Sequence, residues 1–204
     1  MIQPSQLASN PFSTCWIRPD RQAYRFTRPG QLGQLVEHLL RAGGGQVVGP
    51  HGAGKSTLIF TLQEELAGRG YQVIRIQLHA GQRNLATRRE GQPPAAGSWL
   101  IIDGFEQLAA WRRWKLAWQC RRSRVHLLVS SHRCHRFPFT WHISPGPEVA
   151  CELVDELQQG SGTVVSSQDV KRLFREHDGN MRELLFACYD LFEIRTRRQS
   201  ARPG

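Results

Sequence analysis

Short apolar runs alternate along the first three quarters of the chain with longer stretches in which apolar residues recur every three or four positions. The longer stretches predict helices at 30–42, Lys55–Gly68 and Phe105–Arg122. The short runs predict strands at Gln46–Gly49, Tyr71–Leu78, Trp99–Asp103, His126–Ser130 and Thr140–Ser144. Because strands that alternate with helices need crossover connections, we predict an α/β fold, a three-layer αβα domain with a mainly parallel, five-stranded sheet.

From Pro147 onward the pattern is wholly helical, which predicts helices at 147–159, 166–177 and 180–196. Ser166-Ser167-Gln168-Asp169 is typical of a capping box, and Asn180 is placed to cap the last helix. Ala80–Gly97, rich in glycine and proline, predicts a surface segment. The domain organisation we expect is a lead-in at 1–28, the α/β core at 29–146, a small C-terminal helical lid at 147–196 and a basic tail at 197–204.

A glycine-rich loop stands between the first predicted strand and the helix that follows it. Gly49-Pro50-His51-Gly52-Ala53-Gly54-Lys55-Ser56 matches G-x-x-x-x-G-K-S/T at every fixed position, the pattern of a P-loop NTPase. Its backbone N–H groups and the helix N-terminus would hold phosphates, and Lys55 would reach the β- and γ-phosphates. Ser56 would ligate Mg²⁺, and Thr57 would add an α-phosphate contact. The loop therefore predicts ATP and Mg²⁺ as ligands, and no Asn-Lys-x-Asp motif for guanine is evident.

Two later strands end in polar residues, where ligands bind in open parallel sheets. Trp99-Leu100-Ile101-Ile102-Asp103 has the Walker B pattern, in which Asp103 would hold Mg²⁺; the alternative is that Asp103 caps the next helix. Leu127-Leu128-Val129-Ser130-Ser131 ends in hydroxyls. Ser130 or Ser131 would hydrogen-bond the γ-phosphate or the attacking water, and Ser130 is our candidate; the alternative is an ordinary turn residue.

The run Asp103-Gly104-Phe105-Glu106 resembles the Asp-Gly-hydrophobic-acid sequence of NACHT and related signal-transducing (STAND) ATPases. The resemblance implies that Glu106 positions or deprotonates the attacking water. The alternative is a solvated glutamate that the helix dipole favours. ATPases with an additional catalytic strand often carry a glutamate directly after the Walker B aspartate, and this chain has Gly104 there, so ATP hydrolysis stays an open question.

Gly-Asn-x-Arg-Glu-Leu at 179–184 resembles the sensor 2 motif of AAA+ ATPases. That resemblance implies that Arg182 contacts the γ-phosphate from the helical lid; the alternative is a surface arginine paired with Glu183 or Asp178. Asn10-Pro11-Phe12 resembles the start of AAA+ proteins of the secretion and transposition-helper type, which implies that residues 1–28 help to cover the adenine. The eight residues at 132–139 are too few for the helix that presents an arginine finger, so we expect a monomer or weak oligomer.

The net charge of +10, from 27 lysines and arginines against 17 acidic residues, suggests acidic partners such as nucleic acid. Arginine supplies 24 of the cations, a bias that a GC-rich genome would also produce. Trp111, Trp114 and Trp118 recur at helical spacing among arginines. They would either stack on bases from an exposed face or pack on the sheet with the arginines solvated opposite, and amphipathic helices generally favour the second arrangement.

No apolar run reaches the ~20 residues that span a bilayer, and the first residues lack a continuous apolar stretch, so we expect a cytoplasmic protein. His132, Cys134 and His135 lie too close together on one loop to supply a tetrahedral zinc site. The expectation is a slow Mg²⁺-dependent ATPase that acts as a nucleotide switch and regulates a partner protein or nucleic acid. The alternatives are a non-hydrolytic ATP-binding module and a small-molecule kinase, for which no substrate-binding insert is evident.

Overall fold

The computed structural model has one five-stranded sheet in the order β2-β3-β4-β1-β5, and every neighbouring pair is parallel. It describes residues 10–13, 23–79, 81, 94–160 and 162–200, so most of the predicted lead-in and of the Ala80–Gly97 segment lies outside the described residues. The strands are β1 (Gly44–Val48), β2 (Val73–Gln77), β3 (Trp99–Asp103), β4 (His126–Ser131) and β5 (Thr140–His142). The predicted α/β fold with a parallel sheet is confirmed.

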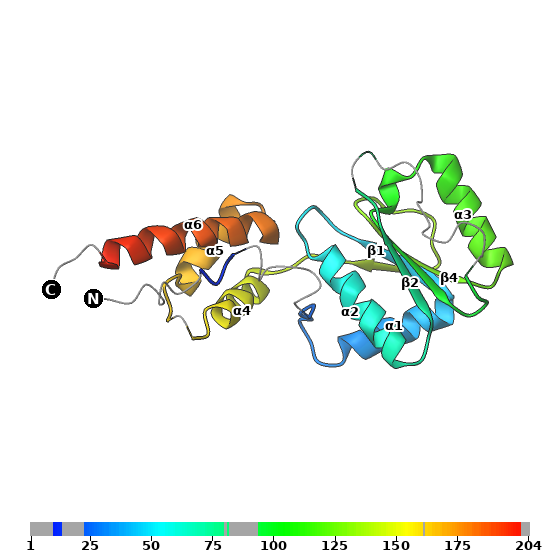
Figure 1. Ribbon diagram of the computed structural model, residues 1–204, viewed down its shortest axis with the longest axis horizontal. Coiled ribbons are helices and arrows are strands. Elements are labelled where there is room, and N and C mark those ends of the chain that lie inside the picture. Colours follow the sequence, from blue (N-terminus) through cyan, green and yellow to red (C-terminus); the bar gives the residue numbers. More distant parts are fainter. Residues whose placement is uncertain (1–9, 14–22, 80, 82–93, 161, 201–204) are drawn as a thin grey trace, which may run out of the picture. The chain divides into compact units, whose positions relative to one another are not determined.

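Helices cover both faces of this sheet (Figure 1). Helices α1 (Gln31–Ala42) and α2 (Lys55–Gly68) lie on one face, and α3 (Ala110–Arg122) lies on the other. Successive strand residues point to opposite faces. Ile101 and Leu128 therefore join the core under α1 and α2, whereas Ile102 and Val129 join the core under α3. The sheet is buried on both faces, as expected for parallel strands that read as continuous apolar runs.

The first strand begins two residues earlier than the sequence predicts. Gly43, Gly44 and Gly45 look like the end of a helix, but only Gly43 caps α1, and β1 starts at Gly44. A Cβ on Gly44 would lie 2.3 Å from the carbonyl oxygen of Leu127. Gly43 thus ends α1, and Gly44 allows β1 to approach β4 closely.

The helix predicted over Phe105–Arg122 is divided in the structure. A 3₁₀ turn, η1 (Phe105–Gln107), is followed by extended residues and then by α3. Phe105 and Leu108 are both buried in the core between α3 and the sheet. Because a 3₁₀ turn brings residues three positions apart onto one side, η1 buries both side chains before α3 begins.

The preference for tryptophans packed on the sheet is wrong. Trp111, Trp114 and Trp118 are 60%, 71% and 52% exposed. Leu116 and Cys120 pack into the core instead. Both sets of residues recur at helical spacing, so the sequence pattern alone does not decide which set faces inward.

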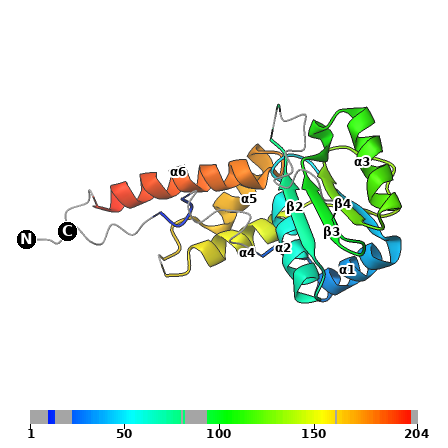
Figure 2. The same ribbon diagram turned by 45° about the vertical axis from the view of Figure 1, so that its right-hand side comes forward.

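A second compact unit contains the described residues of 10–13 and 144–200. Its helices are α4 (Pro147–Leu157), α5 (Ser167–Glu176) and α6 (Met181–Ser200), seen again in Figure 2. Phe12 is fully buried in this unit and meets Phe192 edge-on, with 6.1 Å between ring centroids. Asn10 donates to the Tyr189 carbonyl at 3.1 Å. No described helix has the length and apolar character required to cross a membrane.

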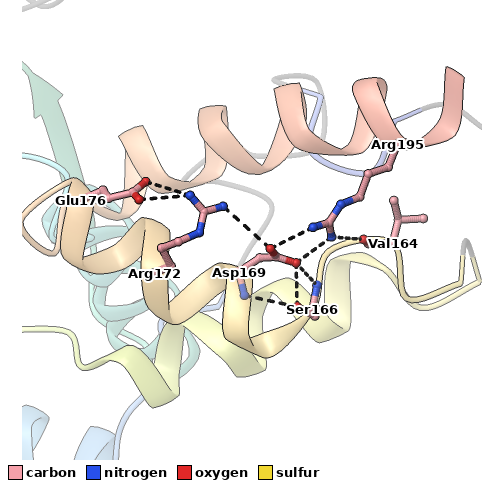
Figure 3. A network of polar contacts seen from close by, with 6 residues as sticks. All are labelled: Val164, Ser166, Asp169, Arg172, Glu176 and Arg195. Atoms are coloured by element: carbon pink, nitrogen blue, oxygen red, sulfur yellow. Dashed lines mark hydrogen bonds and ion pairs between the residues drawn. The ribbon is translucent and has the colours of Figure 1, made fainter. Parts of the chain in front are cut away.

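A network of charged groups joins α5 to α6 (Figure 3). The Ser166 hydroxyl and the Asp169 carboxylate form the predicted capping box, which is confirmed. Arg195 on α6 donates to both carboxylate oxygens of Asp169, at 2.6 and 2.9 Å, and to the Val164 carbonyl at 2.7 Å. Hydrogen bonding from Arg195 lowers the pKa of Asp169 well below its usual range. The ionised carboxylate therefore links the start of α5 to the last turns of α6.

We predict that Arg195→Gln lowers the free energy of unfolding by about 1–2 kcal/mol at neutral pH, because a charged acceptor loses its two strongest donors. Since the folded pKa of Asp169 is depressed, its contribution is present above about pH 4 and is lost as the pH falls below that value. The parent should lose this contribution progressively as the pH falls below about 4, and the variant should not. Urea unfolding of the full chain across this range provides the measurement.

Arg172→Gln is the matched control, because Arg172 reaches the same carboxylate at 3.8 Å from a side chain that is 51% exposed. Exposed pairs of this kind contribute about 0–1 kcal/mol. Equal losses of stability in the two variants would contradict the assignment of the depressed pKa to Arg195.

Candidate active site at the carboxyl edge of the sheet

The glycine-rich loop joins the end of β1 to the start of α2. Gly49 donates to the Ser131 carbonyl at 3.3 Å, which fixes the loop's first residue beside the end of β4. Gly54 adopts a left-handed conformation, and α2 begins at the next residue. No side chain of the described residues caps this end of α2. The first-turn N–H groups and the positive end of the helix dipole are therefore available to bind an anion.

The Lys55 ammonium is held within the loop itself. It donates to the carbonyls of Gly49 and Pro50, at 2.8 and 2.6 Å. Its Nζ also lies 3.0 Å from Nδ1 of His132, which follows β4. Lys55 thus connects the loop to the neighbouring strand end.

The Walker B aspartate and the candidate serine meet directly. The Ser130 hydroxyl donates to Oδ1 of Asp103 and accepts from the backbone N–H of Gly104 at 2.9 Å. Both side chains are buried. Because a hydroxyl has one proton, Ser130 is engaged with Asp103 here and orients that carboxylate. The two strand ends predicted to carry chemistry are therefore joined.

Backbone geometry explains why residue 104 is a glycine. Gly104 has a φ of +86°, a conformation that side-chain-bearing residues rarely adopt. A Cβ at this position would lie 2.7 Å from the Leu78 carbonyl oxygen. The N–H of Leu78, the residue directly after β2, donates to the Asp103 carbonyl at 2.8 Å. The chain therefore stays close to the end of β3 at this point. A glutamate directly after Asp103 is excluded by this close approach.

The next carboxylate, Glu106, lies in η1 and meets the end of β4. Its Oε1 is 3.2 Å from Nε2 of His132. Its Oε2 is buried and has no hydrogen-bond partner among the described residues. A buried carboxylate oxygen without a donor is costly, by about 1–3 kcal/mol, so this atom is suited to accept from a bound molecule.

His132 links the two charged groups and is the residue that the sequence did not single out for this role. Burial, followed by the nearby charge of Lys55, lowers its pKa. Nδ1 also lies 3.2 Å from the Gly49 carbonyl oxygen. In the neutral tautomer protonated at Nε2, the ring accepts from Lys55 at Nδ1 and donates to Glu106 at Nε2. The His51 ring lies against it, tilted by 32°, with centroids 3.6 Å apart. The signal in the sequence was its place directly after the polar strand end.

Ser131, the other candidate hydroxyl, is the last residue of β4, and its side chain contacts the loop that follows. It lies 3.1 Å from Nε2 of His135 and accepts from the Arg133 N–H at 3.2 Å. The His135 N–H donates to the Gln46 side chain at 2.9 Å. These contacts shape the turn after β4 and set the position of His132.

Tyr24, near the end of the predicted lead-in, lies against the loop. Its ring is 3.4 Å from the position that a Cβ on Gly54 would take. Its backbone N–H donates to the Thr61 hydroxyl at 2.9 Å, which ties it to α2. Burial raises the pKa of Tyr24. An aromatic ring therefore stands beside the first turn of α2.

The remaining predicted residues lie in two places. Ser56 and Thr57 follow Lys55 in the first turn of α2. Arg182 is exposed in the first turn of α6, in the helical unit. Its N–H donates to the Asn180 side chain at 3.1 Å, and the Glu183 N–H donates to the same oxygen at 3.3 Å, so Asn180 caps α6 as predicted.

No protein-family model matches the sequence, and no curated protein matches it. Solved structures of RuvB from Thermotoga maritima are similar in fold. One, titled a Holliday junction branch migration motor, has a TM-score of 0.59 at 14% identity, covering 89% of this chain and 73% of its own. A single-substitution variant gives 0.63 at 14% identity, covering 91% and 68%. Another gives 0.60 at 15% identity, covering 88% and 67%. The chain therefore shares the fold of these RuvB structures.

We predict that Gly104→Ala destabilises the protein more than Gly70→Ala. Both glycines have a φ of +86°, but a Cβ on Gly70 meets nothing within 4 Å. The left-handed backbone costs about 1–2 kcal/mol in each variant, so the difference between them measures the collision with Leu78. Urea unfolding of both variants should show an additional loss of about 1–3 kcal/mol for Gly104→Ala. Equal losses would contradict the steric explanation for the glycine.

Proposed function

We propose that this chain binds ATP with Mg²⁺ and hydrolyses it slowly, as a nucleotide switch that regulates a partner protein or nucleic acid. The observation that carries the proposal is the linked arrangement of Lys55, His132 and Glu106 beside a glycine-rich loop. It combines a phosphate-binding cation with a carboxylate whose second oxygen is buried without a partner. These are the groups that phosphoryl transfer to water requires.

Phosphate binding is assigned to the loop Gly49–Ser56 together with Thr57. The backbone N–H groups at the start of α2 would donate to the phosphates. Lys55 now donates to two loop carbonyls and would exchange one or both for phosphate oxygens. Tyr24, whose ring lies beside Gly54, would border the nucleotide.

Mg²⁺ is assigned to the Ser56 hydroxyl and the Asp103 carboxylate. Both offer the hard oxygen atoms that Mg²⁺ prefers. When bound, Mg²⁺ would neutralise charge on the phosphates. Ser130 holds Asp103 in place through the hydrogen bond to Oδ1, which leaves the other carboxylate oxygen for the ion and its waters.

Water activation is assigned to Glu106, as its resemblance to the NACHT-like acid implies. His132 holds Oε1 at 3.2 Å, and the partnerless Oε2 would accept a hydrogen bond from the attacking water. Because His132 also contacts Lys55, movement of Lys55 onto a phosphate would alter the position of Glu106. His132 is therefore a positioning residue that couples phosphate binding to the water.

The helical unit would respond to the nucleotide through Arg182. The sensor 2 resemblance gives this arginine the γ-phosphate as its ligand, and its exposed side chain in the first turn of α6 supports that role. The structurally similar RuvB is described as a branch migration motor on a Holliday junction. A nucleic acid is therefore one of the partners that the switch would regulate.

A non-hydrolytic ATP-binding module is the second candidate, and Gly104 is the observation in its favour. The backbone at Gly104 excludes the glutamate that many ATPases place after the Walker B aspartate. Hydrolysis then depends on Glu106 alone. The two candidates share the same nucleotide site and differ only in phosphate release.

Phosphate release from ATP under single-turnover conditions separates them. We expect slow release by the intact chain, because Oε2 of Glu106 has no partner among the described residues and would accept from the attacking water. Lys55→Ala should abolish release by removing phosphate binding, and Glu106→Gln should reduce it by about 100-fold or more while ATP still binds. ATP binding without release by the intact chain would instead establish the non-hydrolytic module.

The coupling role of His132 has a separate test. We predict that His132→Ala reduces single-turnover phosphate release by about 10- to 100-fold, and that His132→Gln recovers part of the loss because its amide can accept and donate. His142→Ala is the control, since His142 is an exposed histidine on β5 whose described side-chain contact is with Cys134. Unchanged release in His132→Ala would contradict the coupling.

A further inference from the structure

The outward face of α3 is made of aromatic and cationic side chains. Trp111, Trp114 and Trp118 are exposed, and so are Lys115, Arg121 and Arg122. At about 100° per residue, these six side chains fall within an arc of about 120°. The buried residue of α3, Cys120, lies opposite that arc. We call these six residues the α3 face.

The three tryptophans of the α3 face do not attach the helix to the sheet. Leu116 and Cys120 supply the contact with the core. Three of the six tryptophans of the chain are thus displayed on one helix, where they gain nothing from burial. An exposed aromatic cluster of this kind marks an interaction site.

The charge of α3 is of one sign. The helix carries five lysines and arginines and no acidic residue. The Arg112 guanidinium lies 4.8 Å from the Trp111 ring centroid, and that of Arg122 lies 5.8 Å from the Trp118 centroid. Such cation–π contacts restrain the rings and place positive charge beside them. The complement of this face is a polyanion that also carries flat aromatic groups.

We infer that the α3 face binds single-stranded nucleic acid, with bases stacked on the tryptophans and phosphates held by the cations. Base stacking on aromatic side chains combined with a basic surface is the usual chemistry of single-strand binding. With a rise of about 1.5 Å per residue, the three tryptophans are spaced about 4.5 and 6 Å along the helix axis. Those spacings exceed the roughly 3.4 Å between stacked bases, so each ring would receive a base separated from its neighbours.

A base pair in a duplex presents its edges and not its faces. Stacking on the tryptophans therefore selects unpaired bases, whereas the cations alone would bind duplex and single strand alike. Preference for a single strand is the property that separates the proposal from a general effect of the +10 charge.

Other occupants fit this face less well. A second copy would bring five cations against five, which is repulsive. Helices that lie in a membrane surface separate an apolar face from a charged one, but here tryptophans and cations share one arc that contains no leucine, isoleucine or valine. An acidic protein would complement the positive charge, but it has no regular series of flat groups that could stack on the three tryptophan rings.

The proposal does not depend on ATP hydrolysis, because no residue of the α3 face belongs to the nucleotide site. Its test uses the full chain without nucleotide and a fluorescein-labelled 20-nucleotide oligothymidylate, followed by fluorescence anisotropy. A labelled duplex of equal length is the comparison. We expect saturable binding to the oligothymidylate that weakens with salt and quenches tryptophan fluorescence.

The decisive variant replaces Trp111, Trp114 and Trp118 with alanine. Because these side chains are exposed, the variant should keep the parent's circular dichroism and unfolding midpoint. We expect its affinity for oligothymidylate to fall by about tenfold for each tryptophan removed, with duplex affinity unchanged. The corresponding triple phenylalanine variant should retain most of the affinity, since its rings still stack.

Charge variants separate this face from the rest of the basic surface. Lys115→Gln, Arg121→Gln and Arg122→Gln together should weaken binding and reduce its salt dependence. The matched control makes the same change in charge at three exposed arginines outside α3, Arg41, Arg197 and Arg198, and should have a smaller effect.

Three results would overturn the inference. One is an unchanged affinity for oligothymidylate in the triple alanine variant, which would leave only nonspecific charge. Another is the absence of single-strand binding by the parent. The third is tryptophan-dependent binding to polyglutamate, or to vesicles of equimolar phosphatidylcholine and phosphatidylserine, that exceeds binding to the oligonucleotide.

Discussion

Parallel pairing of β1, β3 and β4 brings the polar ends of these strands together at the candidate site. Val48 pairs with Ser131 and Ile102 pairs with Val129, so the three strands end at one edge of the sheet. Gly49, Asp103 and Ser131 consequently emerge side by side although they are far apart in the sequence. An antiparallel strand at any of these places would carry its polar end to the opposite edge.

Two short connections then organise this edge. The hydrogen bond from Ser130 to Asp103 joins the ends of β3 and β4, and His132 joins Lys55 to Glu106. The close approach at Gly104 leaves no room for a side chain directly after Asp103, and the next carboxylate, Glu106, contacts His132. Among the described residues, the buried Oε2 of Glu106 is left without a hydrogen-bond partner at this edge.

The periodicity of the sequence was enough to predict the parallel sheet, and short local motifs predicted the glycine-rich loop before α2 and the caps at Ser166 and Asn180. It could not predict His132, because that contact depends on the turn after β4, where a nonlocal hydrogen bond joins His135 to Gln46. It also misjudged α3, where large and small apolar residues recur with the same helical spacing and only packing decides which face the sheet. Glycines 43–45 were ambiguous because one run serves both a helix end and a strand that approaches its neighbour closely.

The central claim is that this edge of the sheet is a site for ATP with Mg²⁺. Isothermal titration calorimetry of the full chain with ATP, first with Mg²⁺ and then with EDTA, tests it most directly. The claim predicts saturable binding that weakens when EDTA removes the ion, because Mg²⁺ then no longer links the phosphates to Ser56 and Asp103. The absence of saturable binding, or an affinity that is the same with and without Mg²⁺, would contradict it.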